Sequence, residues 1–394
     1  MKRRELLGRG AAIAGGATIA GGLAVASASS APAQAVDAPP VGAETIEFHG
    51  THQAGIEGEP QANQTLVSFD LTGNPEPDDI HRLLSLLTDD AQRLTSGRAP
   101  LADLEPELAS TPARLTVTFG FGPGLVAAVV GEKNVPSWLG PLPAFKQIDR
   151  LQENWSDGDL LLQVAGDDPI SVAHAVHLLV RDTRAFAKVR WSQVGFRQGL
   201  GVHPPGTTMR NLFGQVDGTV NPEPQTPDFA EVVWRPDHST TMVIRRIAMN
   251  LDTWEKADRT GREFAVGRRL RDGSPLTGTA ENDVPDLAAT DAQGFTVIGP
   301  AAHIRRAKTG DPTQRFLRRA YNYDLGPGNA DAVGLIFTAF QADIAHQFVP
   351  VQQRLAQSDG LNEWTTPIGS AVFWIPAGVR PGEIVGAALF EPLG

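Results

Sequence analysis

Runs of apolar residues in the first half of the chain predict two strands, and each run is followed by a helical pattern. Residues 65–72 (TLVSFDLT) and 159–166 (DLLLQVAG) are rich in strand-forming residues. A helical pattern covers residues 77–94 after the first run. After the second run, Asp168 suits an N-cap and Pro169 suits the first helical position. Apolar residues at 172, 176, 179 and 180 then predict one apolar face on this second helix.

The second half of the chain repeats this order. Residues 240–251 predict a strand that leads into a helical stretch reaching about residue 270. Residues 333–343 predict another strand, followed by a helix to about residue 355 and by a strand at 370–376. Two strand-then-helix units in each half predict a duplicated α+β fold, with antiparallel sheets covered by helices on one face. We place the two halves at residues 44–205 and 206–394, with the seam in the Gly-, Pro- and Thr-rich residues 201–209.

The N-terminal residues 1–35 are typical of an export signal. Arg3 and Arg4 precede a leucine pair and a weakly apolar Ala/Gly run at 11–26, and Ala33-Gln34-Ala35 suits a cleavage site. The run is too short and too rich in Ala and Gly to span a bilayer, so no stable membrane span is expected. The pattern resembles a twin-arginine signal, which implies the twin-arginine export machinery as a partner and a periplasmic or extracellular product. A flexible leader is expected at 36–43, and the route gives a first indication of a cofactor.

Composition excludes several classes of function. The chain has 394 residues, 41% of them hydrophobic, and its net charge of -11 is wrong for a nucleic-acid-binding protein. It contains no cysteine, which excludes disulfides, thiolate metal sites and cysteine nucleophiles.

The histidines and the Gly-rich segments have ordinary explanations when taken one at a time. His174 and His177 are three residues apart on the helix face opposite the apolar one, which favours a solvated face over a zinc site. His49 and His52 are a similar pair, and zinc would need a third ligand that the spacing does not supply. Residues 118–125 (TFGFGPGL) lack the Lys of a phosphate-binding loop, so a tight turn is expected there.

Three further segments leave a choice between structure and chemistry. Residues 214–222 (GQVDGTVNP) predict turns, but Asp217 could also move a proton. His303 ends an apolar, strand-like run at 295–304 and could be a structural histidine. The pair Arg318 and Arg319, beside Tyr321 and Tyr323, could be a solvated or salt-bridged edge, and spacing alone does not decide.

A family resemblance changes this balance. Residues 209–222 (MRNLFGQVDGTVNP) resemble the G-x-x-D-G signature of the dye-decolorizing peroxidases, a haem family. Other segments look like that family in its order, over nearly the whole chain after the signal: FHGTHQAGI, TFGFGPGL, GDLLLQVAGDDP, AHIRRA, RRAYNY, FQADIAHQFVPVQ and LNEWTTPIGSAVFWIPAG. The resemblance implies two ferredoxin-like halves, with haem b bound in the second half. This sequence departs from the family's common pattern at Gln215-Val216, where an aromatic residue and Lys are frequent, and at Trp364, where Tyr is common.

The resemblance also implies a role for each candidate residue. His303 matches the proximal histidine that binds the haem iron, Asp217 the distal acid–base and Arg318 the distal arginine, with Arg319 as the alternative if the placement is off by one. Gly218, Thr219 and Val220 would lie against the haem edge. Glu363 is our candidate for the carboxylate that accepts the N–H of His303.

The implied reaction is oxidation of dyes, phenols or other donors by hydrogen peroxide through a ferryl intermediate. Electrons from bulky donors could pass through Tyr321, Tyr323, Trp364 or Trp374, which could equally be core aromatics. A carboxylate base is ionised at mildly acidic pH, where a histidine base would be largely protonated, so an acid-side optimum is expected. Two alternatives remain: a deferrochelatase that removes iron from haem, and an exported haem-binding protein without turnover. A homo-oligomer is possible.

Overall fold

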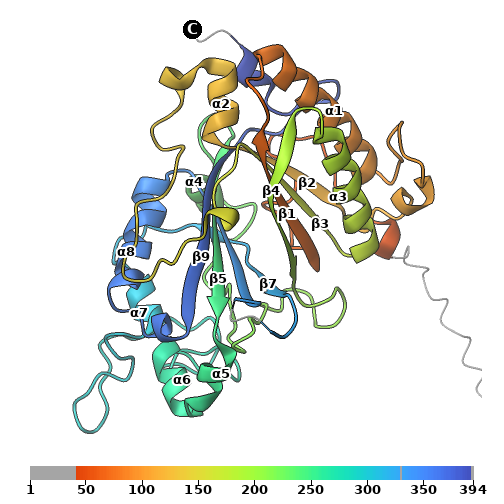
Figure 1. Ribbon diagram of the computed structural model, residues 1–394. Coiled ribbons are helices and arrows are strands. Elements are labelled where there is room, and N and C mark those ends of the chain that lie inside the picture. The colour runs from red at the N-terminus through yellow and green to blue at the C-terminus, as the bar shows by residue number, and fades with distance from the viewer. Residues whose placement is uncertain (1–40, 329–330, 392–394) are drawn as a thin grey trace, which may run out of the picture. The chain divides into compact units, whose positions relative to one another are not determined.

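The strands of the computed structural model pair antiparallel throughout, in an order that contains the same unit twice (Figure 1). The structure describes residues 41–328 and 331–391. The described strands follow the order β5-β9-β2-β3-β1-β4-β7-β8-β6, with a further pairing of β5 and β8. The export signal expected at 1–35 lies outside the described residues.

The first half has the order βαββαβ that defines a ferredoxin-like unit. Its strands are β1 (Asn63–Leu71), β2 (Thr116–Phe121), β3 (Leu160–Gly166) and β4 (Ala187–Phe196), and its long helices are α1 (Pro77–Thr95) and α3 (Pro169–Thr183). A shorter helix, α2 (Pro123–Val130), directly follows β2. The strand order β4-β1-β3-β2 places the fourth strand beside the first and the third beside the second. The Asp168 side chain accepts the Ser171 N–H, as expected for the N-cap of α3.

The second half repeats the unit, with a longer connection between its first and second strands. Its strands are β5 (Thr240–Met249), β6 (Leu317–Arg318), β7 (Tyr321–Asp324), β8 (Val333–Gln341) and β9 (Thr365–Ile375). Helices α4 (Pro227–Val233), α5 (Leu251–Lys256), α6 (Arg259–Val266), α7 (His303–Ala307) and α8 (Val349–Ser358) accompany them. Along the sheet, β9-β5-β8 followed by β7 and β6 again gives the order fourth, first, third, second. The duplicated α+β fold is therefore confirmed, whereas the boundaries at 44–205 and 206–394 stay a prediction.

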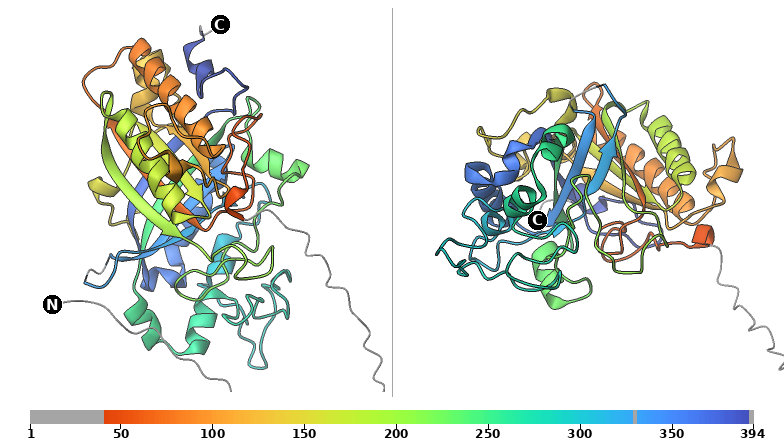
Figure 2. Two further views of the ribbon diagram at one scale, coloured as in Figure 1. Left: turned by 90° about the vertical axis from the view of Figure 1, so that its right-hand side faces the viewer. Right: turned by 90° about the horizontal axis from the view of Figure 1, so that it is seen from below.

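Two short pairings join the sheets of the two halves. Phe121 of β2 pairs with Trp374 of β9, and Phe196 of β4 pairs with Asn322 of β7. Seen from below, the helices of the two halves flank the strands on opposite sides (Figure 2).

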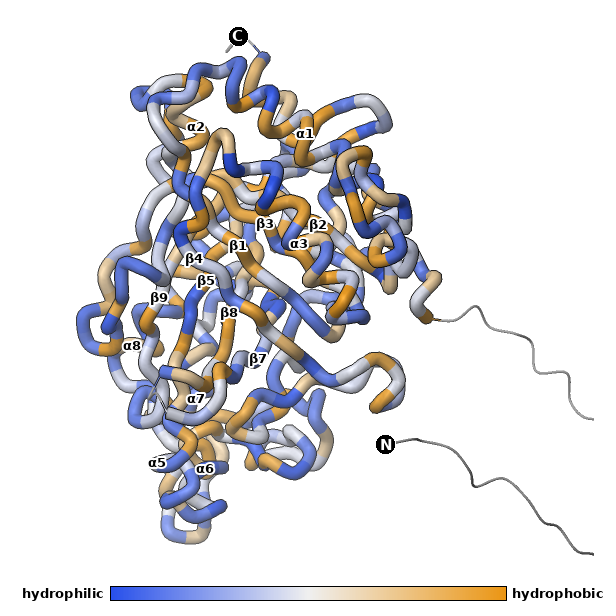
Figure 3. Tube along the Cα trace, turned by 45° about the vertical axis from the view of Figure 1, so that its right-hand side comes forward, coloured by the Kyte–Doolittle hydropathy of each residue, from blue (hydrophilic) through white to orange (hydrophobic). Residues whose placement is uncertain are grey.

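In several strands, alternate residues face two different apolar cores. Val67 and Leu162 pack in the cluster that contains Leu83 and Leu179 of the covering helices. Their strand neighbours, such as Leu66, belong to a second cluster that also includes residues of β5 and β9. This alternation follows from the two-residue period of a strand. In Figure 3 the hydrophobic colour is prominent along β3, whereas β4 is mostly pale to blue.

Several local expectations are wrong. Residues 118–125 are not a tight turn, because β2 runs to Phe121 and Pro123 begins α2 at once. Residues 295–304 contain no strand, and His303 instead begins α7. The helical stretch expected to reach residue 270 is divided into α5 and α6 and ends at Gly267, in left-handed backbone with φ 86°. Residues 41–43, at the end of the expected leader 36–43, form a 3₁₀ turn, and the leader itself stays a prediction.

Among the described residues, no helix combines the length and the apolar character that crossing a membrane requires.

Candidate functional site

Asp217 and Arg318 come together although 101 residues separate them in sequence. Asp217 lies in a turn that is closed by a bridge between Arg210 and Val216 and by a hydrogen bond from its own N–H to Met209 O at 2.9 Å. Arg318 is the last residue of β6, and its Nη1 donates to Asp217 Oδ1 at 3.2 Å. The side chains are 17% and 25% exposed, so this ion pair is partly shielded from water yet still reachable. Of the alternatives left open for Arg318, the structure therefore shows a salt bridge, with Asp217 as its partner.

Asn221 ties the turn to the backbone of Arg318. Its Nδ2 donates to Arg318 O at 2.7 Å, and its Oδ1 accepts the Arg318 N–H at 3.0 Å. This amide therefore pairs with β6 as another strand would, and it sits in the same turn as Asp217. The sequence analysis used Asn221-Pro222 only as a turn signal and missed this contact.

Asn211 supports the turn from within. Its Oδ1 accepts the N–H groups of Phe213 and Gln215 at 3.1 and 3.2 Å. Its Nδ2 donates to Gln215 Oε1 at 3.0 Å and reaches Asp217 Oδ2 at 3.5 Å. Because Asn211 is buried, its amide is held by these local partners and defines the turn that presents Asp217.

His303 is paired with Asp359, not with Glu363. His303 Nδ1 and Asp359 Oδ2 are 2.6 Å apart, and the Asp359 side chain is only 4% exposed. Asp359 also accepts the Leu361 N–H through Oδ1 at 3.0 Å, because it caps the short 3₁₀ helix Gly360–Glu363. The expectation for Glu363 was therefore wrong by four residues. An acidic residue before a short helical segment is the N-cap signal that could have pointed to Asp359.

The surroundings of His303 leave one ring nitrogen available. Burial lowers the pKa of His303, but the charge and hydrogen bond of Asp359 raise it more, and the net shift is upward. The charge of Arg318 lowers this pKa and that of Asp217 raises it, so the three groups act on one another. A neutral imidazole that donates Nδ1–H to a carboxylate presents the Nε2 lone pair on its other edge. The side chain is 31% exposed, and among the described residues nothing hydrogen-bonds to Nε2.

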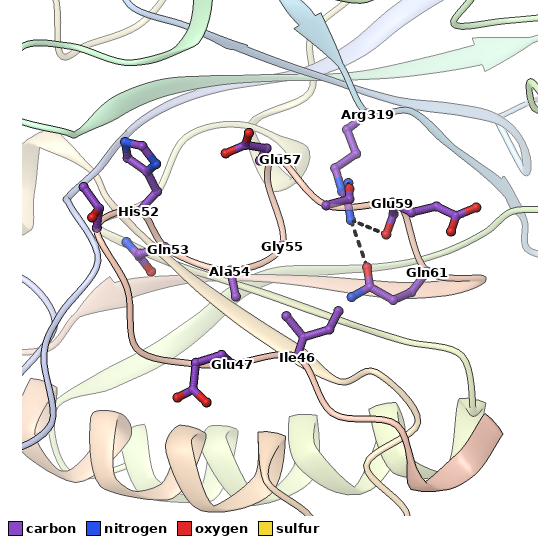
Figure 4. Close-up of a pocket in the computed structure, with 12 residues that line it drawn as sticks. Ile46, Glu47, His52, Gln53, Ala54, Gly55, Glu57, Glu59, Gln61 and Arg319 are labelled. Carbon is purple, nitrogen blue, oxygen red and sulfur yellow. Dashed lines mark hydrogen bonds between the residues drawn. The ribbon is translucent and has the colours of Figure 1, made fainter. Parts of the chain in front are cut away.

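Arg319 points away from this pair and does not serve as the alternative to Arg318. It lines a cavity of about 270 Å³ bordered by residues 46–61, where it is 3% exposed (Figure 4). Its Nη2 donates to Gln61 Oε1 at 2.9 Å, and its Nη1 donates to Gly58 O at 2.5 Å. Burial lowers the pKa of Arg319 to about 10. Neighbouring strand residues project to opposite faces, which explains why the two arginines separate.

The residues after Asp217 have mixed environments. Gly218 has φ 127°, a conformation that favours glycine. The Thr219 hydroxyl donates to Glu281 Oε1 at 2.9 Å, and Val220 is 67% exposed. Their placement along a haem edge stays a prediction.

The candidate electron-carrying aromatics are packed in the core. Tyr321 and Tyr323 are fully buried, and burial raises the pKa of Tyr323 to about 12. The guanidinium of Arg246 lies 4.3 Å from the Tyr323 ring centroid. Trp364 meets Trp254 edge-to-face with centroids 5.0 Å apart, and Trp374 meets Phe121 at 5.8 Å.

Among the other histidines, the rings of His52 and His238 meet with centroids 5.5 Å apart. His174 was expected on a solvated face, but it is 7% exposed and its Nε2 is 2.9 Å from Asp103 Oδ2. The expectation failed because residues 101–110 cover that helix face, a contact that helix periodicity does not show. His52 stacks on Trp234 with centroids 3.7 Å apart. Within residues 41–328 and 331–391, no three His, Asp or Glu side chains are grouped as a metal site.

Comparisons with known proteins agree along the chain. Residues 53–197 match a family model described as Dyp-type peroxidase, N-terminal, and residues 208–380 match Dyp-type peroxidase, C-terminal. A dye-decolorizing peroxidase of Thermobifida fusca is 38% identical over 362 residues, covering 86% of this chain and 84% of the relative. A deferrochelatase of Escherichia coli K12 is 32% identical over 373 residues, covering 87% of each. The crystal structure of a DyP-type peroxidase from Cellulomonas bogoriensis has a TM-score of 0.86 at 50% identity, covering 90% of this chain and 100% of that one.

Proposed function

The chain belongs to the Dyp-type peroxidase family, and from this premise we propose that it is a haem b peroxidase in which Asp217, Arg318 and His303 carry the chemistry. Hydrogen peroxide is the oxidant, and dyes, phenols or similar small molecules are the donors. The observation that carries the proposal is the ion pair of Asp217 with Arg318. Both charges influence the pKa of His303, whose ring is oriented by Asp359.

The residues present fit haem. An imidazole whose Nδ1 is engaged by a buried carboxylate has a fixed ring orientation and a more basic Nε2, which is what an iron ligand needs. The Asp217–Arg318 pair is a proton acceptor beside a permanent cation, which suits a peroxide site. Bound at Nε2 of His303, haem supplies the iron that takes two oxidising equivalents from peroxide and passes them to donors.

The chain's own groups then manage protons and charge. The Asp217 carboxylate would accept a proton from one peroxide oxygen and return it to the other, which could then leave as water when the O–O bond breaks. Arg318 donates hydrogen bonds to the oxygen on which negative charge develops. A carboxylate base stays ionised at mildly acidic pH, so we expect an acid-side optimum. A rate profile for the peroxide step that peaks above neutrality would contradict this assignment.

The direct test is Asp217→Asn, which keeps the size of the side chain but removes its capacity to accept a proton. We expect the rate of reaction with peroxide, followed by stopped-flow absorbance, to fall by about 10²-fold or more. Asp228→Asn is the matched control, because Asp228 forms a surface ion pair with Arg315. An unchanged peroxide rate in Asp217→Asn, with haem bound, would refute the assignment and favour a haem-binding protein without turnover.

A second candidate function is removal of iron from haem. The relatives named deferrochelatase, at 32% identity over most of the chain, are the observation that favours it. Incubation of the protein with haem, followed by measurement of released iron and free porphyrin, separates the two activities. Peroxide-dependent donor oxidation without free porphyrin supports the peroxidase alone.

We further propose that the protein is exported by the twin-arginine route, on the strength of residues 1–35.

A further inference from the structure

We propose that Glu281 is a positioning residue for Asp217, holding the turn on both sides of the carboxylate. Glu281 Oε1 accepts hydrogen bonds from the Thr208 hydroxyl at 2.6 Å and from the Thr219 hydroxyl at 2.9 Å. These threonines flank the turn that carries Asp217. A single oxygen, from a segment more than 60 residues away, therefore fixes where the turn begins and where it ends.

The turn needs such a restraint because its own backbone is permissive. Gly214 and Gly218 adopt φ of 77° and 127°, and glycine in these regions has more freedom than any other residue. A Cβ on Gly218 would lie 3.5 Å from Thr208 Cγ2, which shows that Thr208 packs directly against the turn. Hydrogen bonds to an ionised acceptor are about twice as strong as neutral ones, so a carboxylate suits this restraint better than a hydroxyl.

Glu281 is itself anchored by the surrounding segment. Its carbonyl oxygen accepts from Arg268 Nη1 at 2.8 Å, and the same nitrogen donates to Gly273 O at 2.6 Å. A Cβ on Gly273 would come within 2.9 Å of Val216, the residue before Asp217. Residues 268–281 thus support the Asp217 turn through Glu281 and through the carbonyl oxygens of Leu270 and Arg271, which accept hydrogen bonds from Arg210 at 2.7 Å.

The consequence concerns the peroxide step. Proton transfer by Asp217 depends on its distance to the peroxide oxygens, and a displacement of about 1 Å can cost about 10²-fold in rate. This inference rests on the proposed function, because it matters only if Asp217 moves a proton. Glu281 acts through Thr208 and Thr219 on that geometry and has no reacting atom of its own.

The test compares Glu281→Ala, Glu281→Gln and Asp217→Asn, alone and in the pair Glu281→Ala with Asp217→Asn. We expect Glu281→Ala to slow the peroxide step by about 10-fold to 10²-fold, with the donor-oxidation step unchanged. Glu281→Gln keeps an oxygen at the same place and should restore most of the rate. In the Asp217→Asn background, Glu281→Ala should slow the peroxide step little further. Moving residue 217 has no effect on a proton transfer that the asparagine already cannot perform.

Asp283→Ala is the matched control. Asp283 lies two residues from Glu281 and caps its own segment by accepting the N–H groups of Thr279 and Ala280 at 2.7 and 2.9 Å. Among the described residues, Asp283 forms no hydrogen bond with the Asp217 turn, so its removal should leave the peroxide rate unchanged. If Glu281→Ala does not fold, Thr208→Val and Thr219→Val each remove one hydroxyl and should each slow the peroxide step.

The outcomes separate the two levels of inference. An unchanged rate in Asp217→Asn refutes the proposed function itself. If Asp217→Asn is impaired, three results each overturn the role of Glu281: an unaffected Glu281→Ala, an additive double variant, or an Asp283→Ala as slow as Glu281→Ala. A Glu281→Gln as slow as Glu281→Ala also overturns positioning, because it would mean that the charge or proton of Glu281 is needed.

Discussion

Asp90 and Asp182 place two carboxyl groups at the contact between α1 and α3, far from the candidate site in sequence. Asp90 is 5% exposed, and the Asp182 side chain is 8% exposed. Burial, followed by the hydrogen bond and charge of Asp182, raises the pKa of Asp90 from 3.8 to about 7. At low pH the protonated Asp90 therefore donates to Asp182, and at higher pH the two carboxylates repel.

The sign of the effect on stability follows from proton counting. Between pH 3.8 and about 7 the folded chain keeps a proton on Asp90 that the unfolded chain has released. The free energy of unfolding consequently falls as pH rises through this window and levels off above it. A shift from 3.8 to about 7, at about 1.4 kcal/mol per unit, gives a total loss of about 4 kcal/mol.

Asp90→Asn keeps a hydrogen-bond donor beside Asp182 and removes the carboxyl group that titrates. We expect the variant to match the parent near pH 4 and to exceed it by about 4 kcal/mol above pH 8. Urea unfolding of both proteins across this range, followed by tryptophan fluorescence, measures the difference. Asp78→Asn is the control, because Asp78 lies in the same helix and is exposed. A difference between Asp90→Asn and the parent that does not grow with pH would refute the reasoning.

Other predictions concern the site and the signal. Asp359→Asn should weaken the hold on the ring of His303 and raise the reduction potential of the bound haem, measured by spectroelectrochemical titration, whereas Glu363→Gln should not change it. Asn221→Ala removes both hydrogen bonds to the Arg318 backbone and should slow the peroxide step by about 10-fold or more; a rate equal to the parent's would show that β6 is held without it. Replacing both Arg3 and Arg4 with Lys should leave the folded product in the cytoplasm, seen by fractionation and immunoblotting, and unchanged export would contradict a twin-arginine signal.

The periodic segments were predictable because their signals are local. The strands at 63–71, 160–166, 240–249 and 333–341 lie close to the apolar runs that predicted them. A strand or amphipathic helix needs only its own pattern and one partner surface. The strand β4 was missed because polar residues such as Lys188 and Arg190 alternate with its apolar residues, so no continuous apolar run marks it.

The candidate site shows the same division more sharply. Asp217, Arg318 and His303 could be named from the sequence, because a family signature pointed to them. The partners that orient these side chains could not be read in the same way. Asp359, Asn221 and Glu281 act across 56, 97 and 62 residues of chain, distances over which spacing carries no geometric information.

The amino-acid sequence by itself therefore determined a duplicated α+β fold, the family signature and the candidate catalytic residues. Each of these depends on the pattern within a short segment of the chain. Tertiary structure decided which of two adjacent arginines meets Asp217, which carboxylate holds His303, and which histidine is buried. The physical reason is that hydrogen bonds and ion pairs act over about 3 Å in space. Only packing brings residues that are distant in the chain within that reach.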